Sequence, residues 1–243
     1  MCVDGDLTRP AWARAAWTPR FAQAETGRQA SLATRAALLW DDAALYVAFD
    51  VEERDVWNTG QDRTALLWEE NAVGVSIAGP GAWYELSVSA ANRTSELFFI
   101  WKDAYCRGGR YDTPEFDLAT RCPMVFGGDA GPAHPRGMRW GFLDWRLPGL
   151  RTAVRVDGTM DRRHDIDRGW AVEVALPWSG LARLAASPGP PRDGECWPIN
   201  LTRTQIIDQR AQRYAVAWQA YPDTTVARAM PDHFPQVCFS ADH

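Results

Sequence analysis

The sequence predicts an all-β protein, an antiparallel β-sandwich with long loop insertions. Three observations favour this fold class: apolar residues alternate with polar or small residues in short segments, turn residues separate these segments, and helical periodicity is scarce. Alternation places successive side chains on opposite faces of a strand, so that one face is buried and the other is partly wet. Short strands without intervening helices favour antiparallel pairing. A length of 243 residues suits one large all-β domain, and we expect a single domain over residues 1–243.

The individual strands follow from the alternation. Apolar side chains recur at every second position in residues 45–51, 73–77, 84–88 and 170–176, and a further short strand is expected at 97–99. One short helical turn at most is expected over residues 179–186, after Pro177. The segments are separated by the turn signals Asp41-Asp42, Gly79-Pro80-Gly81, Asp157-Gly158 and Asp193-Gly194.

Residues 102–148 break this pattern. They contain many Gly, Pro, Arg and Asp residues and little alternation. We therefore expect a loop-rich insertion of one or two long loops between strands. Loops of this length in a compact domain are usually functional or mobile.

Composition and charge limit the partners of the chain. Lys and Arg number 26 against 31 Asp and Glu, giving a net charge of −5, so we expect no nucleic acid partner. No apolar run approaches the roughly 20 residues that a membrane-spanning helix needs, so we expect no membrane partner. The first ten residues carry no signal-peptide pattern, which leaves two alternatives for localisation: an intracellular protein, or a secreted protein whose leader was removed.

The five cysteines, Cys2, Cys106, Cys122, Cys196 and Cys238, form no metal-binding spacing. Cys106 and Cys122 flank one loop-like stretch and could pair in an oxidising compartment. The favoured interpretation is that the cysteines are free thiols, buried as small hydrophobic side chains.

Motifs for catalysis and cofactors are absent. The sequence contains no G-x-S-x-G, no P-loop and no G-x-G-x-x-G, and its four histidines lie far apart. We therefore predict no catalytic residue, no metal ligand and no certain cofactor. Asp161, Asp165 and Asp167 could bind Ca²⁺ as oxygen ligands, but the neighbouring arginines favour a charged turn.

Tryptophan is the unusual residue, with 13 Trp among 28 aromatic residues. The apolar C–H face of a sugar ring stacks on an indole, while its hydroxyls need Arg, Asn, Asp or Glu. A groove that combines these residue types has the composition of a carbohydrate site. We expect at least one indole to serve as a ligand platform, whereas strand alternation directs Trp40, Trp170 and Trp178 to the core.

Several short motifs together resemble one family. Each motif is weak by itself, but they occur in the expected order over almost the whole chain and resemble family 9 carbohydrate-binding modules. The motifs are Val3-Asp4-Gly5-x-Leu7 with Trp12, Leu39-Trp40-Asp41-Asp42-x-x-Leu45-Tyr46-Val47-x-Phe49, Trp68-x-x-Asn71-x-Val73-x-Val75-x-Ile77, Trp170-x-Val172-Glu173-Val174-x-Leu176-Pro177-Trp178-x-x-Leu181, Ile199-Asn200-x-x-Arg203, Trp218, and His233-Phe234-x-x-Val237-x-Phe239.

The resemblance implies a DOMON-like β-sandwich, no catalysis, and glycan binding between two indoles, often with structural calcium. Trp68 matches the first of these indoles. The sequence departs from the family where Gly74 replaces an acidic residue, Asn71 replaces an Asp, Ser87 replaces an Arg, and residues 226–232 lack the second Trp. Our hypothesis is that the carbohydrate ligand contacts five residues: Trp68 stacks on the sugar, Trp101 closes the groove, and Glu69, Asn71 and Arg203 form hydrogen bonds with the sugar hydroxyls.

Three alternatives remain open at the level of sequence. A polysaccharide-active glycoside hydrolase could use paired carboxylates on the insertion, such as Asp103 or Glu115. A redox domain could hold haem through Met230 and His233. An interaction module that has lost its sugar site would instead expose a large apolar patch.

Overall fold

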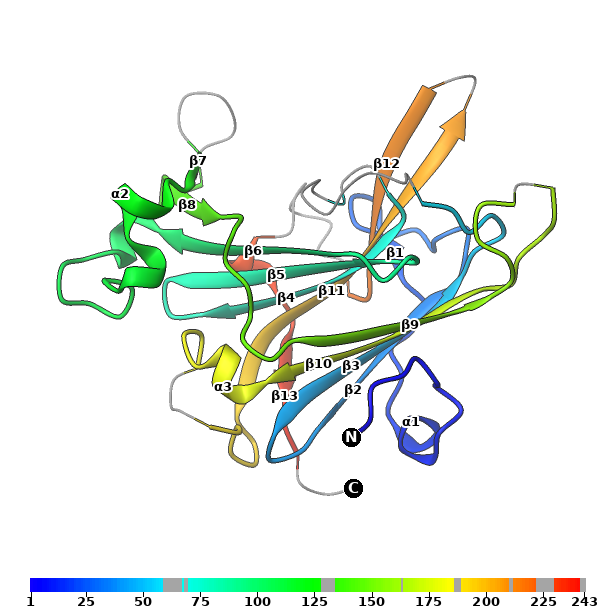
Figure 1. Ribbon diagram of the computed structural model, residues 1–243, viewed down its shortest axis with the longest axis horizontal. Helices are drawn as coiled ribbons and strands as arrows, with labels where there is room; N and C mark the ends of the chain where they lie inside the picture. Colours follow the sequence, from blue (N-terminus) through cyan, green and yellow to red (C-terminus); the bar gives the residue numbers. More distant parts are fainter. Residues whose placement is uncertain are drawn as a thin grey trace.

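The computed structural model describes residues 1–58, 67, 70–127, 134–162, 164–185, 189–209, 212–221 and 230–240. Of residues 207–209 and 212–215, it describes the backbone only. Two antiparallel sheets pack face to face, so the predicted β-sandwich is confirmed (Figure 1). Among the described residues, no helix combines the length and the apolarity that crossing a bilayer requires.

The elements are short helices and strands in the following order: α1 (Pro10–Arg14), β1 (Ala22–Gln23), β2 (Thr34–Trp40), β3 (Ala44–Glu52), β4 (Ala72–Gly79), β5 (Ala82–Ser89), β6 (Thr94–Trp101), η2 (Lys102–Ala104), η3 (Pro114–Phe116), α2 (Leu118–Arg121), β7 (Met124–Phe126), β8 (Arg139–Phe142), β9 (Arg151–Asp157), β10 (Gly169–Pro177), α3 (Trp178–Leu181), β11 (Cys196–Gln209), β12 (Gln212–Gln219), η4 (Pro231–His233) and β13 (Gln236–Cys238).

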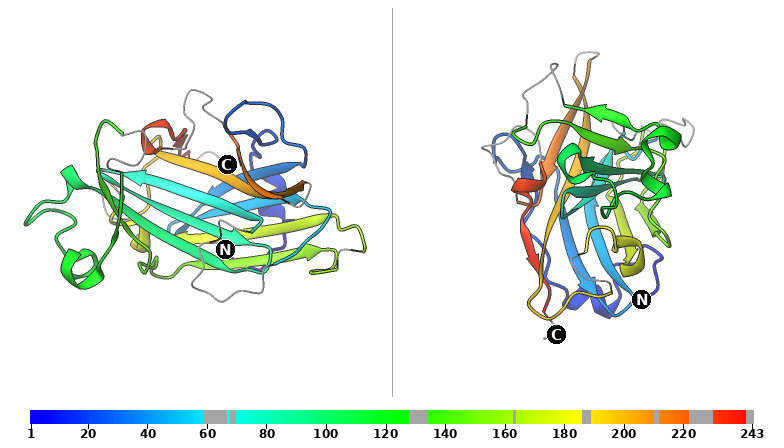
Figure 2. Two further views of the ribbon diagram at one scale, coloured as in Figure 1. Left: turned by 90° about the horizontal axis from the view of Figure 1, so that it is seen from above. Right: turned by 90° about the vertical axis from the view of Figure 1, so that its left-hand side faces the viewer.

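The strands form a large and a small sheet. In the described part of the chain, the large sheet has the order β1-β12-β11-β4-β5-β6-β8-β7, with β13 also paired to β11. The small sheet has the order β2-β3-β10-β9. Figure 2 shows the two layers from two further directions. Each sheet therefore has an inner face toward the other sheet and an outer face away from it.

The core fills the space between the two inner faces. Strands β4 and β5 contribute alternating apolar side chains from the large sheet, and β3 and β10 contribute theirs from the small sheet. All the segments in which the sequence predicts strands are strands, and α3 provides the expected helical turn. Trp170 and Trp178 are buried in this core, as predicted, while Trp40 is half-buried and packs against Phe239.

One buried carboxylate anchors the N-terminal segment to the outer face of the small sheet. Glu173 is 1% exposed, and it accepts hydrogen bonds from the backbone N–H groups of Asp4 and Gly5, from Arg9 and from the indole of Trp12. Two sequence motifs far apart in the chain, at residues 3–12 and 170–181, thus meet at one side chain. Their shared role is structural, because these four donors come from the chain itself.

The insertion and the cysteines differ from the sequence prediction. Residues 102–148 contain β7 and β8, which extend the large sheet beyond β6, in addition to loops. Cys196 and Cys238 form a disulfide between the paired strands β11 and β13. Cys106 and Cys122 are free and exposed, as is Cys2. The prediction of free thiols is thus confirmed for Cys2, Cys106 and Cys122, but their predicted burial, the free state of Cys196 and Cys238 and the possible 106–122 pair were wrong. Strand register, and not loop position, brings two cysteines together.

Candidate functional site

A buried polar cluster lies at one end of the sandwich, between the two sheets. We call it the Glu53 cluster; its members are Thr34, Glu53, Asn71, Arg203 and Gln205, all buried. Glu53 Oε2 accepts hydrogen bonds from Asn71 (2.8 Å), Arg203 (3.0 Å) and Gln205 (3.0 Å). A buried carboxylate with several charged or polar donors is stable only when each partner stays in place, so the cluster fixes the relative positions of β2, β4 and β11.

Arg203 is fully enclosed in this cluster. Its guanidinium also donates to Thr34 Oγ1 (2.7 Å), to the Glu52 carbonyl (2.9 Å) and to Gln205, and it lies 4.8 Å above the Trp218 ring. Burial lowers the pKa of Arg203 to about 10, although Glu53 and Glu52 raise it. The side chain is 0% exposed, so it holds protein groups in place and does not reach a surface ligand.

Asn71 joins the cluster to the start of β4. Its side-chain amide donates to Glu53, and its Oδ1 accepts from the backbone N–H of Ile206 (2.8 Å). The preceding residue, Glu70, forms an ion pair with Arg93. The chain that leads into β4 is thus held on both sides. Trp68 and Glu69 come immediately before this fixed point, but they lie outside the described residues.

Small polar side chains cover part of the outer face of the large sheet. We call this area the outer polar patch; it consists of Ser76, Glu85, Ser87, Ser95, Asn200 and Thr202. Two rows across the strands form it: Asn200, Ser76 and Glu85 are aligned in register, and Thr202, Gly74, Ser87 and Ser95 form the next row. All members except the buried Asn200 are half-buried.

Gly74 lies within the outer polar patch, where the resemblance expects an acidic residue. A Cβ atom at this position would collide with Thr202 Oγ1, so the Thr202 hydroxyl occupies the space that a side chain would need. Two of the positions at which this sequence departs from the family, Gly74 and Ser87, are paired neighbours. The substitutions therefore change one continuous surface, leaving it flatter and uncharged at these two points.

Glu85 supplies the negative charge that remains in the outer polar patch. Burial raises the pKa of Glu85, and this effect exceeds the opposing influence of the hydrogen bond from Trp83 Nε1 (2.6 Å) and of the nearby Arg139. At the end of the same row, the buried Asn200 Oδ1 accepts no hydrogen bond from the described residues. Buried polar atoms normally have partners, so these two acceptors indicate a surface suited to hydroxyl donors.

Trp101 lies away from the other predicted site residues. It is 1% exposed on the outer face, where His134 stacks on its ring at 4.5 Å and Arg136 and Arg139 lie over it. At the opposite end of β6, Thr94 lies in the same row across the strands as Val73 and Arg203. Seven residues at a rise of ~3.3 Å each separate Trp101 from that end by about 23 Å. The structure therefore brings Asn71 and Arg203 together, and it does not bring Trp101 to them.

Four residues were not predicted from the sequence to take part in the site: Glu53, Gln205, Glu85 and Asn200. Glu53 and Gln205 enter the cluster through contacts between different sheets, which no local pattern reports. Glu85 could have been found, because it is the one charged residue in the alternating segment 84–88. Asn200 lies within a motif that the resemblance quoted, but its lack of a partner is visible only in the fold.

The residues of the alternative functions have other partners. Asp103 is bound by Arg136 (2.8 Å), and Glu115 by Arg183 (2.5 Å), so both carboxylates are neutralised by arginine. Met230 contacts His233 through a backbone hydrogen bond at η4. The exposed large hydrophobic side chains among the described residues lie on separate segments: Met124 and Val125 on β7, then Ile166 and Tyr221.

The aspartates considered for calcium also serve the chain itself. Asp167 accepts from the backbone N–H groups of Val56 (2.8 Å) and Thr159 (2.7 Å), and Asp161 accepts from Asn58 (2.6 Å). The described residues contain no group of three or more His, Cys, Asp or Glu side chains arranged to hold a metal ion. Asp161 and Asp167 thus accept hydrogen bonds from the chain that close a turn.

Searches against known proteins found similarity in three-dimensional structure. No family profile and no curated protein matches the sequence. A family 9 carbohydrate-binding module from Caldicellulosiruptor kristjanssonii, solved with cellotriose, aligns with a TM-score of 0.56 at 14% identity, covering 100% of this chain and 91% of that one. The same organism's module solved with glucose aligns with a TM-score of 0.54 at 14% identity, over 98% and 90% of the two chains.

A candidate carbohydrate-binding protein from Bacteroides uniformis aligns with a TM-score of 0.58 at 12% identity, over 99% of this chain and 95% of that one. At such low identity, the alignments establish the fold. Together with the two sheets and their order, they show that this chain has the β-sandwich fold of family 9 carbohydrate-binding modules.

Proposed function

We propose that the protein binds carbohydrate without catalysis, at the outer face of the large sheet where β4 begins. The supporting observation is the outer polar patch, a set of half-buried hydroxyl and carboxylate side chains that lies next to a firmly held chain segment. Sugar hydroxyls act as both donors and acceptors, and such a patch offers both. The structural neighbours were solved with cellotriose and glucose, which supports the same class of ligand.

In this proposal, Trp68 stacks on a sugar ring and Glu69 accepts from its hydroxyls. Glu70 and Asn71 fix the chain directly after them, through Arg93 and through the Glu53 cluster. Asn71 and Arg203 thus act as positioning residues. Such anchoring raises affinity, because less conformational freedom is lost when the ligand binds.

Calorimetric titration with cellotriose, glucose and a panel of neutral oligosaccharides tests the proposal. Trp68→Ala is expected to weaken binding about 10- to 100-fold, the effect of losing roughly 1.4–2.8 kcal/mol of stacking and burial. Trp140→Ala is the matched control, because Trp140 is a half-buried indole on β8 whose ring contacts Tyr105. Equal affinities for the wild type and Trp68→Ala would show that the ligand binds elsewhere.

A further inference from the structure

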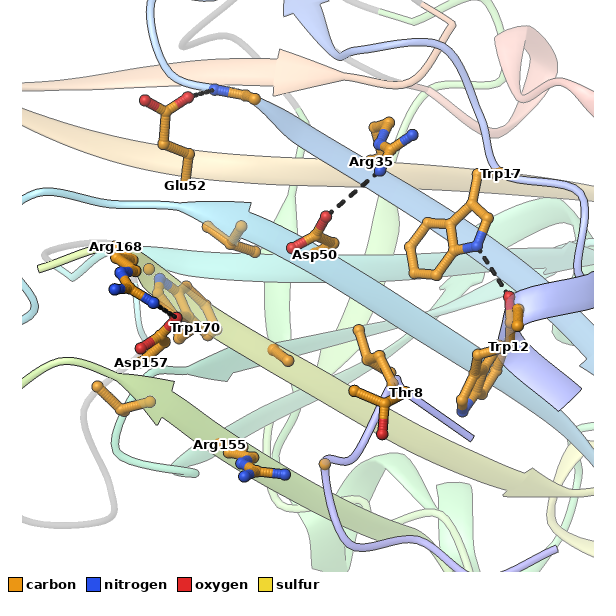
Figure 3. A pocket seen from close by; sticks show the side chains of 18 residues that line it. Thr8, Trp12, Trp17, Arg35, Asp50, Glu52, Arg155, Asp157, Arg168 and Trp170 are labelled. Carbon is orange, nitrogen blue, oxygen red and sulfur yellow. Dashed lines mark hydrogen bonds and ion pairs between the residues drawn. The ribbon is translucent and has the colours of Figure 1, made fainter. Parts of the chain in front are cut away.

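A second surface, on the other sheet, has the features of a ligand site. A groove of about 750 Å³ lies on the outer face of the small sheet, between the N-terminal segment and β9 (Figure 3). This volume falls within the range of roughly 300–1,000 Å³ that is typical of small-molecule sites. All the residues that line the groove belong to the described part of the chain.

The floor of the groove is low because its central strand carries small residues. Ala171 and Gly169 of β10 face outward between longer side chains on β3 and β9. Gly169 has a φ of +148°, and a Cβ atom there would collide with the Val51 carbonyl oxygen, so this position requires glycine. The outer face is therefore hollowed along β10, where an ordinary sheet would carry long polar side chains.

One wall of the groove contains an indole that is held in place. Trp17 is half-buried, and its Nε1 donates to the Trp12 carbonyl (3.0 Å). Trp12 itself is anchored by its bond to Glu173. Arg35 lies 5.6 Å from the centre of the Trp17 ring. Eight of the described tryptophans are buried, so Trp17 is one of only four described indoles that keep part of the ring accessible.

The charged residues around the groove balance one another. Arg35, Asp50, Ala171 and Arg155 form one row in register, and Glu52, Gly169 and Asp157 form the next. With Arg168, the lining contains three arginines and three carboxylates. The ion pairs are long and exposed: Arg35 and Asp50 are 3.5 Å apart, and Arg168 and Asp157 are 3.6 Å apart. Such exposed ion pairs are weak, so their side chains are free to reorient and form hydrogen bonds with a ligand.

From this geometry we propose that the groove is a second saccharide-binding site, independent of the one at Trp68. A balanced set of donors and acceptors suits a neutral polyhydroxy ligand better than an anion or a cation. A sugar ring packs its C–H face against the uncovered part of Trp17, while its hydroxyls donate to Asp50 and accept from Arg35 and Arg155. The hollow over Ala171 and Gly169 gives the ring room to lie on the sheet.

Fluorine NMR of the full chain labelled with 5-fluorotryptophan tests each site separately. The Trp17 and Trp68 signals are assigned from Trp17→Phe and Trp68→Phe, and the titrants are cellohexaose, xylohexaose and mannohexaose. We expect at least one neutral hexasaccharide to shift the Trp17 signal, and Asp50→Asn to weaken that shift at least fivefold in apparent Kd. Asp42→Asn, an exposed aspartate in the β2–β3 turn, is the matched control.

Each outcome separates the two proposals. If only the Trp68 signal moves, the second site is overturned and the proposed function stands. If only the Trp17 signal moves and Asp50→Asn weakens the shift, the second site stands and the site at Trp68 is wrong. Stronger binding of polygalacturonate than of the neutral sugars would overturn the assignment to neutral ligands, and no shift at Trp17 with any sugar would overturn the groove as a saccharide site. Unchanged thermal unfolding of Asp50→Asn confirms that the variant is folded.

Discussion

Two carboxylates, one on the outer face of each sheet, differ in the number of hydrogen bonds they accept: Glu173 is buried and Glu85 is half-buried. Glu173 on the small sheet accepts bonds from two backbone N–H groups, an arginine and an indole. Glu85 on the large sheet accepts one bond from the described residues, given by Trp83, and burial raises its pKa. The comparison teaches that burial alone does not mark a functional carboxylate. The number of donors that the chain itself provides separates a structural anchor from a group with unused capacity.

The largest expected effect comes from removing the anchor. Glu173→Ala leaves Arg9, the Trp12 indole and two backbone N–H groups without their acceptor, so we expect the free energy of unfolding to fall by about 3–5 kcal/mol. Urea unfolding followed by fluorescence measures this loss. Glu25→Gln, at an exposed position, is the control and should change the free energy by less than about 0.5 kcal/mol. A loss below about 1 kcal/mol for Glu173→Ala would contradict the anchoring role.

The second prediction is that replacing Glu85 raises the stability of the protein, whereas replacing Glu173 lowers it. Burial disfavours the charged form of Glu85, so Glu85→Gln should stabilise the protein at a pH above the folded pKa of Glu85. Because the pKa of Glu85 is higher in the folded state than in the unfolded state, the folded state binds the proton more tightly. The charged Glu85 therefore destabilises the folded state fully above its folded pKa. This destabilisation disappears as the pH falls through the folded pKa toward 4.5, the pKa of the unfolded state.

Thermal unfolding of Glu85→Gln and the wild type from pH 4 to pH 8 checks this sign. The advantage of the variant should shrink on acidification, and a constant difference would show that Glu85 does not titrate as inferred. The same variant should bind neutral oligosaccharides about three- to tenfold more weakly, if the outer polar patch contacts the ligand. Gained stability together with lost affinity would identify Glu85 as a residue kept for binding and not for folding.

How much of this could be predicted from sequence depends on the range of the interaction. Period-2 alternation predicted β3, β4, β5 and β10, because each strand reports its own buried face. Period-2 alternation of apolar residues does not identify the second half of β11, because Arg203 and Gln205 occupy the inner face that elsewhere carries Val and Ile. Those two polar residues are tolerated because Glu53, directly after β3 of the small sheet, accepts hydrogen bonds from both.

The candidate site was predicted less well, for the same physical reason. The sequence suggested Asn71 and Arg203 as ligand contacts, but both side chains are buried in the Glu53 cluster. Trp101 was chosen because it follows a strand near the insertion, whereas register places it at the far end of β6. The groove beside Trp17 has no local signal in the sequence, since it is built from four strands, β2, β3, β9 and β10, and the N-terminal segment.

A third carboxylate tests whether the number of hydrogen-bond donors or the burial of the side chain determines how much stability is lost when the carboxylate is replaced. Asp41, in the β2–β3 turn, accepts from the backbone N–H groups of Ala43 (2.9 Å) and Ala44 (3.0 Å) and from the Tyr46 hydroxyl (2.9 Å), yet its side chain is 45% exposed. Burial raises the pKa of Asp41, but the hydrogen bonds from Ala43, Tyr46 and Ala44 outweigh it, and the pKa lies below the usual 3.8.

The smallest effect is therefore expected at Asp41. The stabilisation that Asp41 provides is fully present above its unfolded pKa of 3.8, and it is lost as the pH falls through the lower pKa of the folded state. Asp41→Asn should cost only about 0.5–1 kcal/mol at pH 7, since solvent screens an exposed carboxylate and the amide oxygen can still accept the two backbone bonds. The difference from the wild type should narrow below pH 3.8 in acid unfolding experiments. A loss as large as that of Glu173→Ala would mean that the number of donors, and not burial, decides how strongly a carboxylate holds this fold together.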